Sequence, residues 1–287
     1  VGTDLTISQV SRLLDDQMET DYETVYAAIE EGIDLLEHDS VATADSDTAN
    51  SNASGDMASA QTASDASSPL YILLDLQKKI NEDFPTPSDT NFQVKTVPDS
   101  LAPYLSPAFY LTPPVDATQD NTIYINPSQN TDGITLLTTL AHEGFPGHLY
   151  QTVYSNRIFS DMHTDPARKL IWYGGYLEGW ALYVEFLSYD YAATLLEQAG
   201  QSDAAQSARL EKHTRSLQLC MYTLLDLLIH GEGAGYDQVA EVLGKFGIDS
   251  PGTCEAIYTY IAEEPCNYPK YYIGYLEILQ LQDTARS

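Results

Sequence analysis

The chain has 287 residues, which is enough for one large domain or two smaller ones with a substantial hydrophobic core. It holds 13 Lys and Arg residues against 42 Asp and Glu residues, for a formal net charge of −29. This negative charge repels the phosphates of nucleic acids and anionic lipid headgroups, so the composition argues against partners of both kinds. No apolar run approaches the roughly 18 residues that a membrane-spanning helix needs.

The first 100 residues predict two helices separated by a low-complexity segment. Apolar residues recur at intervals of three and four over 1–38 and again over 70–84, which is typical of amphipathic helices. Between them, residues 40–68 consist almost entirely of Ser, Ala, Thr, Asp, Asn and Gly. Such a composition cannot bury enough apolar surface to order itself, so we expect a flexible insertion there.

The period then changes to one that predicts strands. Short runs of β-branched and aromatic residues occupy 91–97, 108–112 and 121–125, and the last two are expected to form a hairpin with a long loop. Apolar spacing of three and four predicts helices at 133–157, 165–192, 203–230, 236–246, 253–264 and 268–283. The sequence therefore predicts a single mainly α domain (α+β) over 1–287, with a small antiparallel sheet or hairpin beside the first long helix.

The three cysteines, Cys220, Cys254 and Cys266, suggest no functional site. Their spacing does not fit a metal cluster of the Cys-x-x-Cys type. A helix over 253–264 would hold Cys254 and Cys266 about 18 Å apart, which is too far for a disulfide. We therefore expect these cysteines to be unpaired or to form one optional bridge, without a functional role.

Two of the six histidines lie in the segment His142-Glu143-Gly144-Phe145-Pro146-Gly147-His148, inside an apolar predicted helix. Neutral imidazoles are good zinc ligands, and an adjacent glutamate can take a proton from a metal-activated water. In the zincin motif the histidines are four residues apart on one helix face, whereas a spacing of six places them about 120° apart on an ideal helix. Pro146 has no amide hydrogen, so the helix is expected to kink or widen into a π-bulge and bring His148 back towards His142. The alternative is a pair of core histidines with ordinary hydrogen bonds.

Two further acidic residues, Glu178 and Glu185, lie two turns apart on one face of the predicted helix 165–192. A carboxylate in an apolar stretch needs a cation or hydrogen-bond donors when it is buried. Glu178 is therefore a candidate third zinc ligand. Pairing with Arg168 or Arg215 is the alternative.

Asp226 and His230 lie four residues apart near the end of the predicted helix 203–230, so they share a face. His230 could donate a hydrogen bond to a developing oxyanion while Asp226 fixes its tautomer. A histidine at a helix C-terminus also interacts favourably with the helix dipole, which is the alternative.

Together these motifs resemble the bacterial family known as domain of unknown function 885. Its members carry His-Glu-x-x-Pro-Gly-His followed by Gln, then Glu-Gly-Trp-Ala, Asp-x-x-x-His and a C-terminal Tyr-x-x-Gly. The chain has these motifs in the same order, at His142 to Gln151, Glu178 to Ala181, Asp226 to His230, and Tyr271 to Gly274. Family members are usually considerably longer, and this chain resembles their C-terminal half.

The family in turn is similar to the gluzincin metallopeptidases, and to carboxypeptidase Taq among them. The resemblance implies a zincin-like helical domain in which His142, His148 and Glu178 hold zinc and Glu143 is the general base. It also implies that His230 or Tyr271 stabilises the oxyanion, although Tyr271 could serve packing alone. The residues that would support the metal or contact substrate are Asp226, Glu185, Tyr110, Gln151 and Asn267, the last within Pro265-Cys266-Asn267 where the family has Pro-Gly-Gln.

We therefore expect a zinc-dependent peptide hydrolase in which Glu143 activates a water for attack on a peptide carbonyl. The strand at 108–112 could bind the substrate backbone as an added strand. Two alternatives stay open: a non-catalytic, surface-exposed binding lipoprotein fragment that keeps the scaffold, and a zinc hydrolase of a non-peptide amide or ester. The acidic, Ser- and Asp-rich composition favours an extracellular or cell-surface location.

Overall fold

The computed structural model describes residues 2–33, 68–86, 90–114, 117, 119–129, 133–163 and 165–287. The chain divides into two compact units: a helical unit of residues 1–39 and 165–287, and a sheet unit of residues 40–164. Apart from Ser68, the insertion predicted at 40–68 lies outside the described residues. Helices dominate the described residues and a small sheet accompanies them, so the predicted mainly α class is confirmed.

The sheet unit contains a three-stranded sheet in the order β1-β3-β2, formed by β1 (Phe92–Thr96), β2 (Ala108–Leu111) and β3 (Asn121–Ile125). β2 and β3 are antiparallel, with Tyr110 opposite Ile123, which confirms the predicted hairpin. β1 instead joins β3 in parallel, so the sheet is mixed rather than antiparallel. The alternation of side chains fixes the faces of a strand but not the direction of its neighbour, and the sequence pattern could not reveal this pairing.

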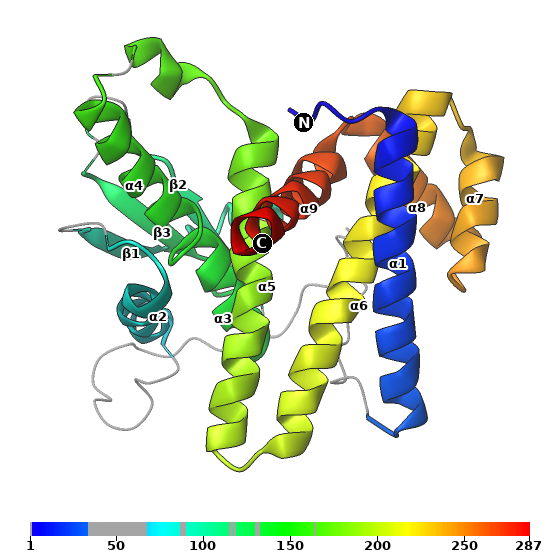
Figure 1. Ribbon diagram of the computed structural model, residues 1–287, viewed down its shortest axis with the longest axis horizontal. Coiled ribbons are helices and arrows are strands. Elements are labelled where there is room, and N and C mark those ends of the chain that lie inside the picture. Colours follow the sequence, from blue (N-terminus) through cyan, green and yellow to red (C-terminus); the bar gives the residue numbers. More distant parts are fainter. Residues whose placement is uncertain are drawn as a thin grey trace. The chain divides into compact units, whose positions relative to one another are not determined.

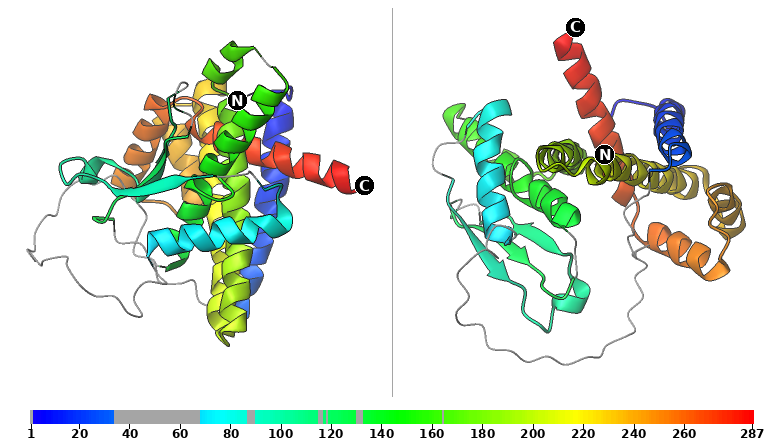
Figure 2. Two further views of the ribbon diagram at one scale, coloured as in Figure 1. Left: turned by 90° about the vertical axis from the view of Figure 1, so that its left-hand side faces the viewer. Right: turned by 90° about the horizontal axis from the view of Figure 1, so that it is seen from below.

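Three helices belong to the sheet unit: α2 (Pro69–Asp83), α3 (Gly133–Glu143) and α4 (His148–Asp161). α2 begins where the hydroxyl of Ser68 accepts a hydrogen bond from the Tyr71 amide. α3 packs against both α2 and the edge strand β2 (Figure 2). The core of the unit is apolar and fully buried, with Leu73, Ile123, Leu140, Phe145 and Leu149 among its members. This core fixes the end of α3 and the start of α4.

The helical unit contains α1 (Ile7–Glu30), α5 (Gly174–Gln198), α6 (Ser202–Asp226), α7 (Tyr236–Lys245), α8 (Pro251–Glu263) and α9 (Asn267–Arg286). α6 packs against α1, α5 and α9, while α7 pairs with α8 (Figure 1). Leu14 of α1 and Leu225 of α6 are fully buried. None of the described helices combines the length and the apolar character that crossing a bilayer requires.

α5 and α9 cross with their backbones in contact, and glycines make this possible. A Cβ on Gly179 would lie 2.4 Å from the carbonyl carbon of Gly274, and a Cβ on Gly274 would lie 2.1 Å from the carbonyl oxygen of Gly175. No side chain fits at either position. The Glu-Gly-Trp-Ala and Tyr-x-x-Gly motifs of the sequence therefore meet at one helix crossing.

The three cysteines are free, so the optional bridge does not form. Cys220 and Cys254 are buried, whereas Cys266 is exposed at the start of α9. Burial raises the pKa of the Cys220 thiol to about 12, so this thiol stays protonated at neutral pH.

A buried carboxylate joins α1 to α6 and α9. Asp21 is 1% exposed and accepts hydrogen bonds from His213 Nδ1 at 2.7 Å and from the Ser216 hydroxyl. Because Ser216 donates its only proton to Asp21, the Tyr272 hydroxyl, 2.7 Å away, donates to Ser216. Gln17 supplies a further donor to Asp21 at 3.1 Å. Sequence analysis missed this network, although Asp21 falls on the buried face of α1 with Val10 and Leu14.

Replacing Asp21 by Ala should destabilise the helical unit by about 3 kcal/mol, because the buried hydroxyl of Ser216 and the partly buried ring of His213 lose their acceptor. Urea unfolding followed by circular dichroism measures this change. Asp16→Ala, which alters an exposed acid on the same helix, is the matched control and should change stability by less than about 0.5 kcal/mol. Equal effects of the two substitutions would refute a structural role for the network.

Candidate metal centre

The chain leaves the helix between His142 and His148. α3 ends at Glu143 and α4 begins at His148, so the continuous helix predicted over 133–157, with a kink or π-bulge, is wrong. The intervening turn contains a cis peptide bond between Phe145 and Pro146. Pro146 has no amide to continue the helical hydrogen bonds, and Gly147 N–H bonds instead to the Ala141 carbonyl at 2.9 Å. Pro146, which predicted a distortion, therefore contributes to a full break of the helix instead of a kink within it.

The turn packs directly against the end of α3, and this contact requires Gly147. A Cβ on Gly147 would lie 1.7 Å from the carbonyl oxygen of His142 and 2.4 Å from that of Ala141. Gly144 is confined as well, since a Cβ there would lie 2.4 Å from Leu73 Cδ2. The fold-back of the turn places the first residue of α4 beside the last turn of α3, despite the spacing of six residues.

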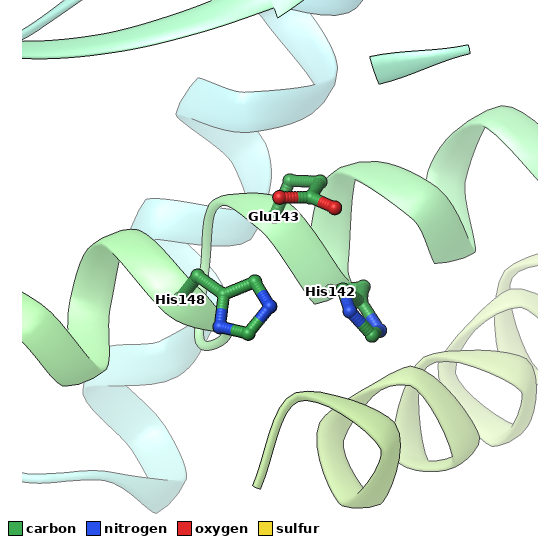
Figure 3. Close-up of side chains that lie close together, drawn as sticks. All are labelled: His142, Glu143 and His148. Carbon is green, nitrogen blue, oxygen red and sulfur yellow. The ribbon is translucent and has the colours of Figure 1, made fainter. Parts of the chain in front are cut away.

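As a result the two imidazole rings lie close together (Figure 3). The ring centroids of His142 and His148 are 4.9 Å apart and the ring planes are nearly perpendicular. Potential ligand atoms of His142, Glu143 and His148 all lie within 4.8 Å of one another, and the three side chains are half-buried. Two imidazoles and a carboxylate at this separation are a donor set that suits zinc. The residues present therefore fit the metal that the sequence predicts.

The edge strand β2 orients Glu143. Tyr110 N–H donates a hydrogen bond to Glu143 Oε2 at 2.8 Å, while the Tyr110 hydroxyl donates to Asn121 Oδ1 at 2.7 Å. The side-chain amide of Asn121 in turn donates to the Asn91 carbonyl at 3.1 Å. Among the described residues, Glu143 Oε1 has no hydrogen-bond partner. Asn121 was not predicted as a site residue. It is a buried polar residue at the start of β3, and its place at the beginning of a predicted strand is the feature that could have indicated it.

Tyr110 and Gln151, which the resemblance links to the site, belong to the same unit. Burial raises the pKa of the Tyr110 hydroxyl well above its usual range, so Tyr110 remains a neutral donor. Gln151 is buried one turn after His148, and its N–H bonds to the Gly147 carbonyl at 2.9 Å. The structure thus brings His142, Glu143, His148 and Tyr110 together.

The other candidate residues lie on the helical unit. Glu178 precedes Gly179 at the crossing of α5 with α9, and Tyr271 lies one turn before Gly274 at the same crossing. Glu185 is 8% exposed and pairs with Arg215, whose Nε lies 3.4 Å from Glu185 Oε1. Pairing with an arginine, which was the alternative to metal binding, therefore occurs at Glu185.

Asp226 and His230 connect helices. α6 ends at Asp226 and continues as a π-helical turn from Leu227 to Gly231 (η4). Asp226 Oδ1 accepts the Cys266 N–H at 3.2 Å, at the start of α9, and His230 Nε2 donates to the Ile261 carbonyl of α8 at 3.0 Å. Burial raises the pKa of Asp226, an effect that hydrogen bonding to Cys266 and the charge of His230 oppose. The pair therefore positions α8 and α9, and the bond to Ile261 occupies one ring nitrogen of His230.

Gly147→Ala should disrupt the turn, because the new methyl group would overlap the His142 carbonyl oxygen. We expect a loss of about 2 kcal/mol or more in the free energy of unfolding, together with weaker zinc binding. Urea titration and equilibrium dialysis measure the two effects. Gly133→Ala in α3 is the matched control, since a Cβ there meets nothing within 4 Å. If both variants bound zinc like the unaltered chain, the close approach would not position His148.

The Asp226→Asn variant should gain stability relative to the unaltered chain as the pH rises. Because burial raises the pKa of Asp226, the folded chain holds this proton more tightly than the unfolded chain. The stabilising contribution is present at low pH and is lost as the pH rises through the pKa of the folded state. Urea unfolding between about pH 4 and pH 7 should therefore show the stability difference moving in favour of Asn. A difference that stays constant or moves in favour of Asp would contradict this.

Comparisons with known proteins show the family of the chain. A search of curated proteins found no match. A solved structure described as a putative lipoprotein from Colwellia psychrerythraea is similar, with a TM-score of 0.66 and 19% sequence identity. The match covers 99% of this chain and 47% of that protein, so the chain spans about half the length of its solved relative. The sequence profile of a bacterial protein family of unknown function, DUF885, matches residues 2–287. The chain therefore belongs to the DUF885 family.

Proposed function

We propose that the protein is a zinc-dependent peptide hydrolase related to the gluzincins, with His142, His148 and Glu178 as metal ligands. The observation that carries the proposal is the juxtaposition of two imidazoles and a carboxylate at the break between α3 and α4. A half-buried group of three potential zinc ligands, two of which are brought together by a turn that only glycine permits, supports a metal site over a pair of core histidines.

A bound zinc ion would act as a Lewis acid that polarises the scissile carbonyl and acidifies water. Glu143 is the base in this proposal. Tyr110 N–H holds Oε2, which leaves Oε1 to take the proton of the attacking water and to deliver it to the leaving amine. The fixed orientation favours a base over a third ligand, because one carboxylate oxygen is already engaged.

Substrate would bind along β2. Among the described strands, β2 pairs with β3 alone, and Tyr110 N–H points to Glu143 from the other edge of β2. In an antiparallel pair, alternate residues direct their backbone groups to the same edge, so Ala108 shares this direction with Tyr110. An extended peptide added here would gain main-chain hydrogen bonds beside the base, with little dependence on its side chains.

Two roles fall to the helical unit. Glu178 completes the ligand set in this proposal, since catalytic zinc sites use three protein ligands and leave one position open. We assign the oxyanion donor to Tyr271, because His230 Nε2 already donates to Ile261. We also propose an extracellular or cell-surface location, which the description of the Colwellia relative as a putative lipoprotein supports.

Glu143→Gln should abolish hydrolysis and keep the metal. Loss of the base is expected to lower the rate by about 10²-fold or more, while His142 and His148 still bind zinc. A peptide-library digest read by mass spectrometry, with and without chelator, measures hydrolysis, and metal analysis measures zinc. Loss of zinc from this variant would make Glu143 a ligand and refute its role as base. Bound zinc with no cleavage of any peptide by the unaltered chain would favour a binding protein, and cleavage of acyl esters alone would favour the non-peptide hydrolase.

Glu178→Gln tests the third ligand in the same assays. We expect weaker zinc binding. The control is Glu197→Gln, which alters another residue of α5, one in an exposed ion pair with Arg209, and should leave zinc binding unchanged. If Glu178→Gln bound zinc like the control, Glu178 would not be a ligand.

A further inference from the structure

A small cavity of about 300 Å³ lies in the helical unit. No proposed metal ligand lines it, although Asn267, which the resemblance links to substrate or metal support, does. Three segments that are far apart in sequence form its walls. The lining residues are Gly2, Trp172, Tyr173, Gly174, Glu264, Pro265, Cys266, Asn267 and Lys270. A cavity of this volume is at the small end of ligand sites, so it suits a molecule smaller than a drug or a nucleotide.

One wall is aromatic and partly open to solvent. Trp172 is 61% exposed and Tyr173 is 42% exposed, although large apolar side chains are normally covered. Gly174 lets the indole lie close to the backbone, because a Cβ there would be 2.7 Å from the Trp172 ring. The Lys270 ammonium lies 5.4 Å from the centre of the same ring. This wall offers apolar surface with a cation at its edge.

The polar wall carries opposite charges that do not pair. Glu264, Asn267 and Lys270 all line the cavity, and the structure gives their side chains no hydrogen bond or ion pair with any described residue. The Lys270 ammonium lies 5.1 Å from the centre of the Tyr271 ring as well as beside the Trp172 ring. The residues that line this small space therefore include one ammonium-bearing, one carboxylate-bearing and one carboxamide-bearing side chain.

The start of α9 does not add an anion site. The amides of Cys266 and Asn267 already interact with the Asp226 carboxylate, and Pro269 has no amide hydrogen. A single ammonium opposite a carboxylate is poorly suited to a phosphate, which would meet repulsion from Glu264. The charges instead match a ligand that carries one group of each sign.

We propose that this cavity binds a free α-amino acid with an apolar side chain. Lys270 pairs with the ligand carboxylate and Glu264 with its ammonium group, while the Asn267 carboxamide donates to the carboxylate or accepts from the ammonium group. The apolar side chain packs on Trp172 and Tyr173. The proposal does not depend on zinc, because every group that it uses belongs to the helical unit and none is a proposed metal ligand.

Isothermal titration calorimetry on the full chain in the presence of EDTA tests this binding, with L-phenylalanine and L-leucine as probes. N-acetyl-phenylalanine lacks the ammonium group and phenylalanine amide lacks the carboxylate. Each should bind about tenfold more weakly than phenylalanine, because each loses one charged hydrogen bond. Chelation separates the outcome from that of the proposed hydrolase, since amino-acid binding should survive the removal of metal.

Matched variants assign the contacts. Lys270→Met and Glu264→Gln should each weaken phenylalanine binding about tenfold, while Lys245→Met and Glu263→Gln alter residues outside the cavity and should have no effect. Circular dichroism confirms that each variant is folded, and the blocked ligands test the proposal on the unaltered chain. Equal binding of free and blocked phenylalanine, no binding at millimolar concentration, or full binding by Lys270→Met would each overturn it.

Discussion

The backbone of Gly147 lies so close to the carbonyl oxygen of His142 that no side chain fits between them. This contact determines the geometry of the candidate metal centre. It turns the chain back onto the end of α3, so two histidines six residues apart come as close as ligands that share a helix face. Glu143, the last residue of α3, then projects beside them and meets the free edge of β2. Each part of the centre thus depends on a local break that is packed against a rigid core.

Much of the fold could be predicted because it follows from apolar periodicity. The amphipathic helices at 70–84 and 236–246 correspond to α2 and α7, and the hairpin of β2 and β3 follows from two aromatic runs. The break after Glu143 was underestimated, since Pro146 signals a distortion while the full break also depends on tertiary packing around Gly144 and Gly147. A π-helical turn does occur, but at Leu227–Gly231, after α6, which contains no proline or glycine.

The candidate site also has parts that could be predicted from the sequence and parts that could not. Imidazole chemistry and spacing singled out His142 and His148, and the structure brings their rings together. Asp226 and His230 were recognised as a pair, yet their partners are backbone groups of Cys266 and Ile261, which no side-chain motif encodes. The cavity beside Lys270 was missed because its aromatic and acidic walls come from separate segments that only the tertiary fold joins.

The glycine crossing of α5 and α9 fixes the positions of the Glu-Gly-Trp-Ala and Tyr-x-x-Gly motifs relative to one another. Gly179 and Gly274 touch backbone to backbone, so a slide of α9 by one residue, or a rotation about its axis, would drive a side chain into α5. The register of Tyr271 relative to Glu178 is therefore fixed by steric exclusion, without any bond between the two side chains. An insertion or deletion that changes the register of α9 would need compensation at α5, so a family member that loses one of these glycines should also have altered the other.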